Sequence, residues 1–142
     1  MQRLIVMLAM LFSCAGVVHA QERIALVVGN GGYEVGRLKN PVNDANDVAA
    51  ALRDVGFTVT VETDITRASL RKAIREFGNR LGEDDVGLFY FAGHGVQVEG
   101  VNYLLPIGAD IASEDEVPDE AVSINSVLRK MTAANNLSLI HI

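Results

Sequence analysis

The stretch GLFYFAGHGVQ, residues 87–97, joins a short apolar run to a histidine that stands between two glycines. Such a run, bounded by glycine, is typical of a buried strand in a parallel sheet. Ligands of open α/β sheets bind beyond the carboxyl ends of the strands, where His94 would lie. Gly93 and Gly95 would let the backbone adopt unusual angles and approach a substrate closely. Because imidazole titrates near pH ~6.5 and can accept and return a proton, His94 is a candidate catalytic base; a histidine that only bonds a loop remains the alternative.

The rest of the chain supplies the other layers of such a fold. Residues 23–28 and 57–61 are predicted strands, and Asn40-Pro41 is a predicted helix start, with Asn40 as the cap. Apolar residues at helical spacing predict one helix up to Val55 and a second with an inner face. That inner face consists of Leu70, Ile74, Phe77 and Leu81. A hairpin over 96–104, a third helix over 123–131 and the start of a fourth strand over 137–142 complete the prediction.

Strand, helix, strand, helix, strand at short spacing predicts βαβ units with right-handed crossovers and helices on both faces of the sheet. The 142 residues, 49% of them apolar, are enough for one domain. No basic patch stands out in a chain of formal charge −6, which disfavours nucleic acid as a partner.

The first twenty residues have the pattern of a secretory signal. A positive start at Met1–Arg3 precedes the apolar stretch 4–12, and Val18-His19-Ala20 offers small residues for a peptidase. The stretch is too short for a membrane span, so the predicted product is an exported domain of residues 21–142, periplasmic or secreted. Cys14, the single cysteine, lies inside this signal, and lipid anchoring through it is a minor alternative.

Four segments resemble the caspase-like family of cysteine peptidases, in its metacaspase-type and bacterial branch (peptidase C14). They are RIALVVGNGGY, LKNPVNDANDVAAALRDVGFTV, LFYFAGHGVQVEGVNYLLPIGADI and EAVSINSVL, in the family's order. The resemblance implies a three-layer α/β/α sandwich with a mainly parallel sheet, here incomplete at the C-terminus. It also implies that His94 is the catalytic base and that Gly95 gives a backbone N–H to the oxyanion hole, a donor that typically contributes ~3–4 kcal/mol.

The family's nucleophilic cysteine has no counterpart in the sequence after the signal. In caspases the histidine precedes that cysteine by about 50 residues, so it is expected near position ~144. We therefore expect a fragment that contains the catalytic histidine but not the cysteine and that hydrolyses no peptide, because an acyl-enzyme needs the nucleophile. The alternative is a non-catalytic caspase-like module that binds a peptide or a protein partner.

Two acidic features complete the expectations. The resemblance implies that Asp44 helps to line a pocket for Arg or Lys at the cleaved bond. A second acidic feature, the run Asp110, Glu114, Asp115, Glu116, Asp119 and Glu120, is expected to be a solvated loop; calcium is a minor alternative, because some metacaspases need it and acidic loops bind it. No other cofactor and no metal site is expected. A flavodoxin-like or receiver domain would share the sheet, but it gives no role to Gly93-His94-Gly95.

Overall fold

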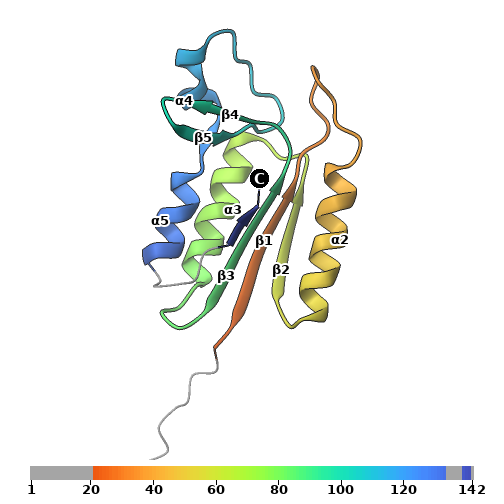
Figure 1. The fold of residues 1–142 in the computed structure, drawn as a ribbon, viewed down its shortest axis with the longest axis vertical. Coiled ribbons are helices and arrows are strands. Elements are labelled where there is room, and N and C mark those ends of the chain that lie inside the picture. Colours follow the sequence, from red (N-terminus) through yellow and green to blue (C-terminus); the bar gives the residue numbers. More distant parts are fainter. Residues whose placement is uncertain (1–20, 134–138, 142) are drawn as a thin grey trace, which may run out of the picture.

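The apolar runs of the sequence form a four-stranded parallel sheet, in the order β2-β1-β3-β7. The structure, a computed structural model, describes residues 21–133 and 139–141. The strands of this sheet are β1 (Arg23–Gly29), β2 (Thr58–Thr63), β3 (Val86–Ala92) and β7 (Leu139–His141). Since the strands run parallel, their carboxyl ends meet at one edge of the sheet (Figure 1).

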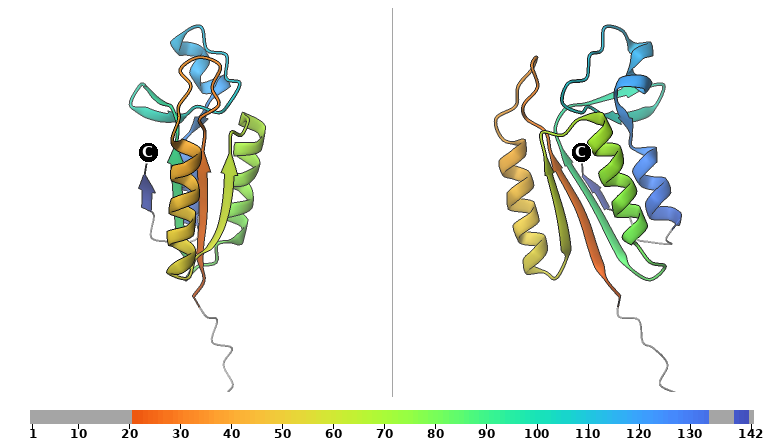
Figure 2. Two further views of the ribbon diagram at one scale, coloured as in Figure 1. Left: turned by 90° about the vertical axis from the view of Figure 1, so that its right-hand side faces the viewer. Right: turned by 180° about the vertical axis from the view of Figure 1, so that it is seen from behind.

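Helices cover both faces of the sheet, as the βαβ pattern predicts. The helix α2 (Pro41–Asp54) lies on one face, and α3 (Arg67–Arg80) and α5 (Asn125–Ala133) lie on the other. The right-hand view in Figure 2 shows the strands between α2 on one side and α3 and α5 on the other. The fold is therefore α/β with a parallel sheet flanked by helices, as expected.

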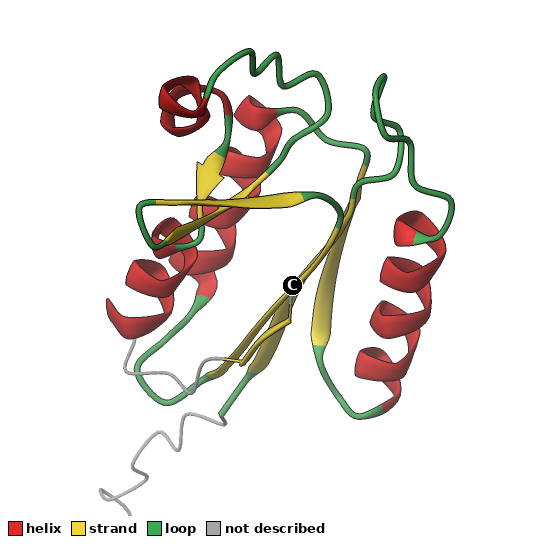
Figure 3. Ribbon diagram, turned by 45° about the horizontal axis from the view of Figure 1, so that its top comes forward, coloured by secondary structure: helices red, strands yellow, loops and turns green. Residues whose placement is uncertain are grey.

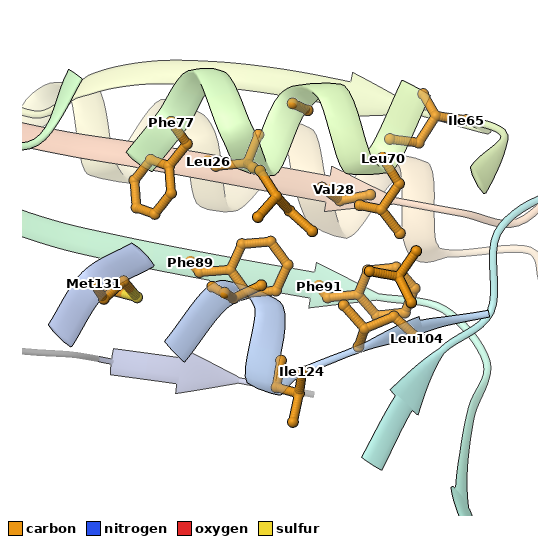
Figure 4. Packing of buried hydrophobic residues seen from close by; sticks show 14 of the residues in the cluster. Leu26, Val28, Ile65, Leu70, Phe77, Phe89, Phe91, Leu104, Ile124 and Met131 are labelled. Atoms are coloured by element: carbon orange, nitrogen blue, oxygen red, sulfur yellow. The ribbon is translucent and has the colours of Figure 1, made fainter. Parts of the chain in front are cut away.

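The core is unequal on the two faces. On the α2 face, Val27 meets the small residues Ala45 and Ala49. On the other face a larger cluster fills the space between the sheet and α3 and α5 (Figure 4). Its fully buried members include Leu26 and Phe89 from the strands, Leu70 from α3, and Val127 and Met131 from α5.

The α2 face is packed closely because β1 ends on a glycine. A Cβ placed on Gly29 would overlap the Pro41 carbonyl oxygen and would lie 2.7 Å from the Ala45 Cβ. The first turn of α2 can therefore rest directly on the end of β1.

A second, antiparallel sheet lies at the carboxyl edge of the first (Figure 3). It consists of β4 (Gly95–Val98), β5 (Val101–Leu104) and β6 (Val122–Ser123), in the order β4-β5-β6. The predicted hairpin is confirmed, and its two-residue turn places Glu99 at φ 49° and Gly100 at φ 79°. This is the turn geometry that matches the twist of hairpin strands.

Two expectations are corrected. Asn40 stands at the N-cap of α2 but makes no side-chain capping bond, because its backbone is already helical at φ −103° and ψ −24°. The acidic stretch is not a plain loop: it forms a 3-10 turn, η2 (Glu114–Glu116), and the short helix α4 (Val117–Glu120). The burial of Val117, 2% exposed, holds α4 against the hairpin.

Within 21–133 and 139–141, no helix has the length and apolarity needed to cross a membrane.

Candidate active site

His94 lies at the junction of the two sheets. Strand β3 ends at Ala92 and β4 begins at Gly95, so Gly93 and His94 alone join them. The half-buried imidazole therefore lies at the carboxyl edge of the parallel sheet, as the sequence predicts.

A backbone carbonyl fixes the orientation of the imidazole ring. The Nε2 atom lies 2.6 Å from the Gly36 carbonyl oxygen, which can only accept a hydrogen bond. Nε2 must therefore be protonated, and in the neutral ring the lone pair is on Nδ1. Gly36 has φ +72°, and a Cβ there would lie 3.1 Å from Nε2. The ring is thus held as the tautomer whose Nδ1 can accept a proton.

The backbone of His94 is held by a tyrosine hydroxyl. The carbonyl of His94 accepts a bond from the Leu105 N–H at 3.0 Å, as in an antiparallel pair. The reciprocal bond is replaced by Tyr33, whose hydroxyl accepts the His94 N–H at 3.0 Å and donates to the Leu105 carbonyl at 2.9 Å. The tyrosine ring also lies against the imidazole, with centroids 4.6 Å apart.

The need for Gly93 is steric, which corrects the expectation that both flanking glycines serve unusual backbone angles. Positive φ values among the described glycines occur elsewhere, at Gly36, Gly56, Gly100 and Gly108. A Cβ on Gly93 would lie 2.7 Å from the Tyr33 hydroxyl and 2.9 Å from the Phe91 ring. Gly93 therefore makes room for the tyrosine that holds His94.

The register of the hairpin sets the direction of the Gly95 N–H. Because His94 and Leu105 form the hydrogen-bonded pair, the next pair, Gly95 and Leu104, is the non-hydrogen-bonded one. The N–H of Gly95 therefore points away from β5, and β4 is an edge strand. Its direction suits the predicted donation to an oxyanion, a role that remains a prediction.

Two polar side chains hold the loop that contains Tyr33. Asn30, fully buried at the end of β1, accepts the Ile65 N–H and donates to the Leu105 carbonyl. Asp64 accepts the N–H groups of Gly31 and Gly32 at 2.7 and 2.8 Å. These bonds fix the path of the chain immediately before the tyrosine.

These supporting residues are not visible in the sequence. The Tyr33 hydroxyl gives no signal until the fold brings it beside His94, 61 residues away. Burial raises the pKa of Tyr33 above its ordinary value, and the nearby Asp64 charge raises it further, against the bond from His94, which lowers it. The hydroxyl is therefore protonated at neutral pH and able to donate.

A cavity of about 430 Å³ opens beside His94. Its walls come from the loop after β1 and the loop after β5, with Tyr33, Val35 and Pro106 among them. Glu34 and Asp110 line it, and among the described residues no Lys or Arg does. The negative charge of this cavity favours a ligand group with a positive charge.

Asp44 lies in the first turn of α2 and is exposed, at the same edge of the sheet as His94. Its charge acts on the strand below, since burial and then Asp44 raise the pKa of Tyr90 in β3. Asp44 is not part of the lining of the cavity beside His94. Its predicted role at the cleaved bond remains a prediction.

The remaining predictions concern metal and the leader. Across 21–133 and 139–141, no three His, Cys, Asp or Glu side chains gather in a way that could hold a metal ion, and calcium stays an untested alternative. The predicted signal, with Cys14, lies outside the described residues.

Comparison with known proteins identifies the family. The family model of the caspase domain, peptidase family C14, matches residues 22–140. This chain belongs to the caspase domain family. The match covers β1 to β6, the first two residues of β7 and the junction that contains His94.

Two curated relatives place the caspase domain among larger proteins. The chain is 35% identical over 91 residues to the human Mucosa-associated lymphoid tissue lymphoma translocation protein 1, and 34% identical over 91 residues to its mouse homolog. Each alignment covers 63% of this chain and 11% of the relative. The chain thus spans about a tenth of the length of these proteins.

One solved structure shares the fold. Protein GSU0716 from Geobacter sulfurreducens superposes with a TM-score of 0.65 at 23% identity. The match covers 84% of this chain and 48% of that one. At this identity the likeness supports the caspase-like fold alone.

Proposed function

We propose that this caspase domain provides the histidine half of a cysteine endopeptidase site. The observation that carries the proposal is the bond from Nε2 of His94 to the Gly36 carbonyl, which leaves Nδ1 as the proton acceptor at the carboxyl edge of the sheet. The attacking thiol is proposed to come from polypeptide that continues beyond β7. The 142-residue chain by itself is proposed to hydrolyse no peptide.

The position of β7 supports this source for the thiol. It pairs in parallel with β3, with His141 opposite Tyr90. His94 follows Tyr90 by four residues, so a chain continuing in register would be level with His94 four residues after His141. A cysteine near that level would lie beside the imidazole, close to the spacing that the sequence predicts.

The chemistry follows the order of a cysteine peptidase. Nδ1 of His94 takes the thiol proton, and the thiolate attacks the peptide carbonyl carbon. The Gly95 N–H stabilises the oxyanion that forms. His94 then gives its proton to the leaving amine, and water, activated by the same ring, releases the acid and restores the thiol.

Cleavage after Arg or Lys is the finer part of the proposal, in line with the metacaspase branch that the sequence resembles. Two acidic places could receive a basic side chain: Asp44, and the cavity that contains Glu34 and Asp110. Replacing Asp44 by Asn, or Glu34 and Asp110 by Gln and Asn, separates them. The variant that loses preference for Arg over norleucine, measured as kcat/KM, identifies the receiving acid.

The decisive experiment compares two chains. The 142-residue chain and the chain continued by the downstream codons of its gene are incubated with fluorogenic peptides ending in Arg, Lys or Asp. Only the continued chain is expected to cleave, after Arg or Lys, and His94→Gln should lower its kcat/KM by at least about a hundredfold. A stop codon with no downstream cysteine would favour the non-catalytic peptide-binding module instead. Activity of the short chain would contradict the proposal that the thiol comes from beyond β7.

The base itself can be tested on the 142-residue chain. The ¹⁵N chemical shifts of the His94 ring, assigned by difference from His94→Gln, should show a protonated Nε2 and an unprotonated Nδ1 in the neutral form. The opposite tautomer would remove the acceptor from the site and contradict the proposal.

A further inference from the structure

Positive charge gathers on the two helices that cover the larger core. The helices α3 and α5 contain seven of the chain's twelve Lys and Arg residues and one of its 18 acids, Glu76. That acid pairs with Lys72 at 3.7 Å. No basic patch stands out in the sequence because these residues are spread over 64 positions, and only the fold brings the two helices together. The chain is therefore acidic overall but strongly basic on one face.

The arrangement of arginines on α3 is unfavourable for the isolated helix. Arg67, Arg71 and Arg75 stand four residues apart and line one stripe of its surface. Like charges at this spacing repel by a few tenths of a kcal/mol per pair. The Nε atom of Arg67 is also buried and has no hydrogen-bond partner among the described residues. An anion over this stripe would offset the repulsion between the exposed arginines.

A groove continues from this stripe. Its volume is about 360 Å³, and Arg71 and Arg75 on one wall face Arg129 and Lys130 of α5 on the other. Ile74 and Val122, each 3% exposed, lie at the floor of the groove, and the aliphatic stems of the surrounding Arg and Lys side chains add the rest of its apolar surface. The Lys130 stem passes over Gly78, where a Cβ would lie 2.7 Å from the lysine Cδ, so the glycine lets α3 and α5 approach closely at this wall of the groove.

We propose that the groove between α3 and α5 binds an acidic peptide segment of a partner protein, in which carboxylates flank one large apolar side chain. Arginine suits this partner because its planar group can bind a carboxylate through two hydrogen bonds. The apolar surface between the walls receives the apolar side chain. A nucleic acid is disfavoured, because a strand extending past the groove would meet the acidic remainder of the chain. The groove lies on a helix-covered face, apart from His94, so the proposal is independent of catalysis.

The test measures binding of a fluorescein-labelled peptide, Gly-Glu-Glu-Leu-Glu-Glu-Gly, to the 142-residue chain by fluorescence anisotropy. We expect saturable binding that weakens between about 0.05 M and about 0.5 M salt. The double variant Arg71→Gln, Arg75→Gln should lower the affinity about tenfold or more. The matched control Arg53→Gln removes an exposed arginine from α2 on the opposite face and should leave the affinity unchanged. Circular dichroism confirms that the variants, all at exposed positions, remain folded.

Peptide variants test the two parts of the chemistry. Gln in place of every Glu should abolish binding, and Gly in place of Leu should weaken it. The proposal is overturned if the wild-type chain does not bind the peptide, if the double variant binds like the Arg53→Gln control, or if an oligothymidylate of equal charge competes better than the peptide. Self-association that the double variant abolishes would make a second copy of this chain the occupant and would also overturn it.

Discussion

At the scale of single residues, the Tyr33 hydroxyl replaces a direct backbone hydrogen bond between His94 and Leu105. Its hydroxyl stands between the His94 N–H and the Leu105 carbonyl, so a side chain completes the pairing of two strands. The same ring packs against the imidazole. One residue thus holds both the backbone and the side chain of the candidate base.

Replacing Tyr33 by Phe removes the hydroxyl and keeps the ring. We expect the free energy of unfolding to fall by about 1–2 kcal/mol, because two hydrogen bonds are lost and a partly buried N–H is left unpaired. Urea unfolding measures the change. Tyr103→Phe is the matched control, since it removes a hydroxyl from β5 without touching the pair of His94 and Leu105. Equal losses in both variants would contradict the role given to Tyr33.

The raised pKa of Tyr33 predicts a pH dependence. Both states keep the proton below the ordinary pKa of 10.0, so the contribution of this residue to stability is fully present there. Above it the unfolded chain releases the proton first, and stability is lost as the pH rises toward the higher folded pKa. Unfolding free energies measured up to pH ~11 should therefore fall more steeply for the wild-type chain than for Tyr33→Phe. Parallel curves would contradict the direction of the shift.

The sequence predicts a residue's position well when the pattern that marks it is adjacent in the chain, and poorly when its partners are distant in sequence. The position of His94 at the carboxyl edge of the sheet was predictable because the glycines around it and the apolar run before it are adjacent in the chain. Tyr33, Asn30 and Asp64 were not, because each acts through partners 32 or more residues away. The reason for Gly93 was missed for the same cause, since its neighbour Tyr33 is distant in sequence.

At the scale of elements, α2 depends on one close approach to β1. Gly29→Ala should lower the free energy of unfolding by about 1–3 kcal/mol, because the new methyl group overlaps the Pro41 carbonyl oxygen and the helix must move. The denaturant midpoint measures the loss. Asn46→Ala, on the exposed side of the same helix, should change it little. A neutral Gly29→Ala would show that the helix start can shift freely.

The main helices and strands were predictable because their apolar spacing is periodic, and only their ends moved by one or two residues. The pieces α4 and β6 were not, since elements of four and two residues have no period to read. Their order comes from tertiary contacts, such as the burial of Val117 among residues of the hairpin.

At the scale of the whole molecule, residues 1–20 predict that the protein is exported and that it is cleaved before Gln21. Expressed with this leader in a bacterial host, the protein should be recovered outside the cytoplasm, and its mass should correspond to a chain beginning at Gln21. Arg3→Glu should slow export, because the positive start of the leader is removed. Intact mass spectrometry of cell fractions measures both. A protein of full mass that stays in the cytoplasm would contradict the predicted signal.

Because only Gly93 and His94 join β3 to β4, a movement of the small sheet would also move the imidazole of His94. A partner that binds the hairpin and tilts it would change the backbone angles of Gly93 and His94. These two residues are the whole link between β3 and β4, so no other residue of the link can take up the change. The distance from Nδ1 to an arriving sulfur would then change without any contact at either atom. In the proposed peptidase, activity would then depend on what binds the outer surface of the hairpin.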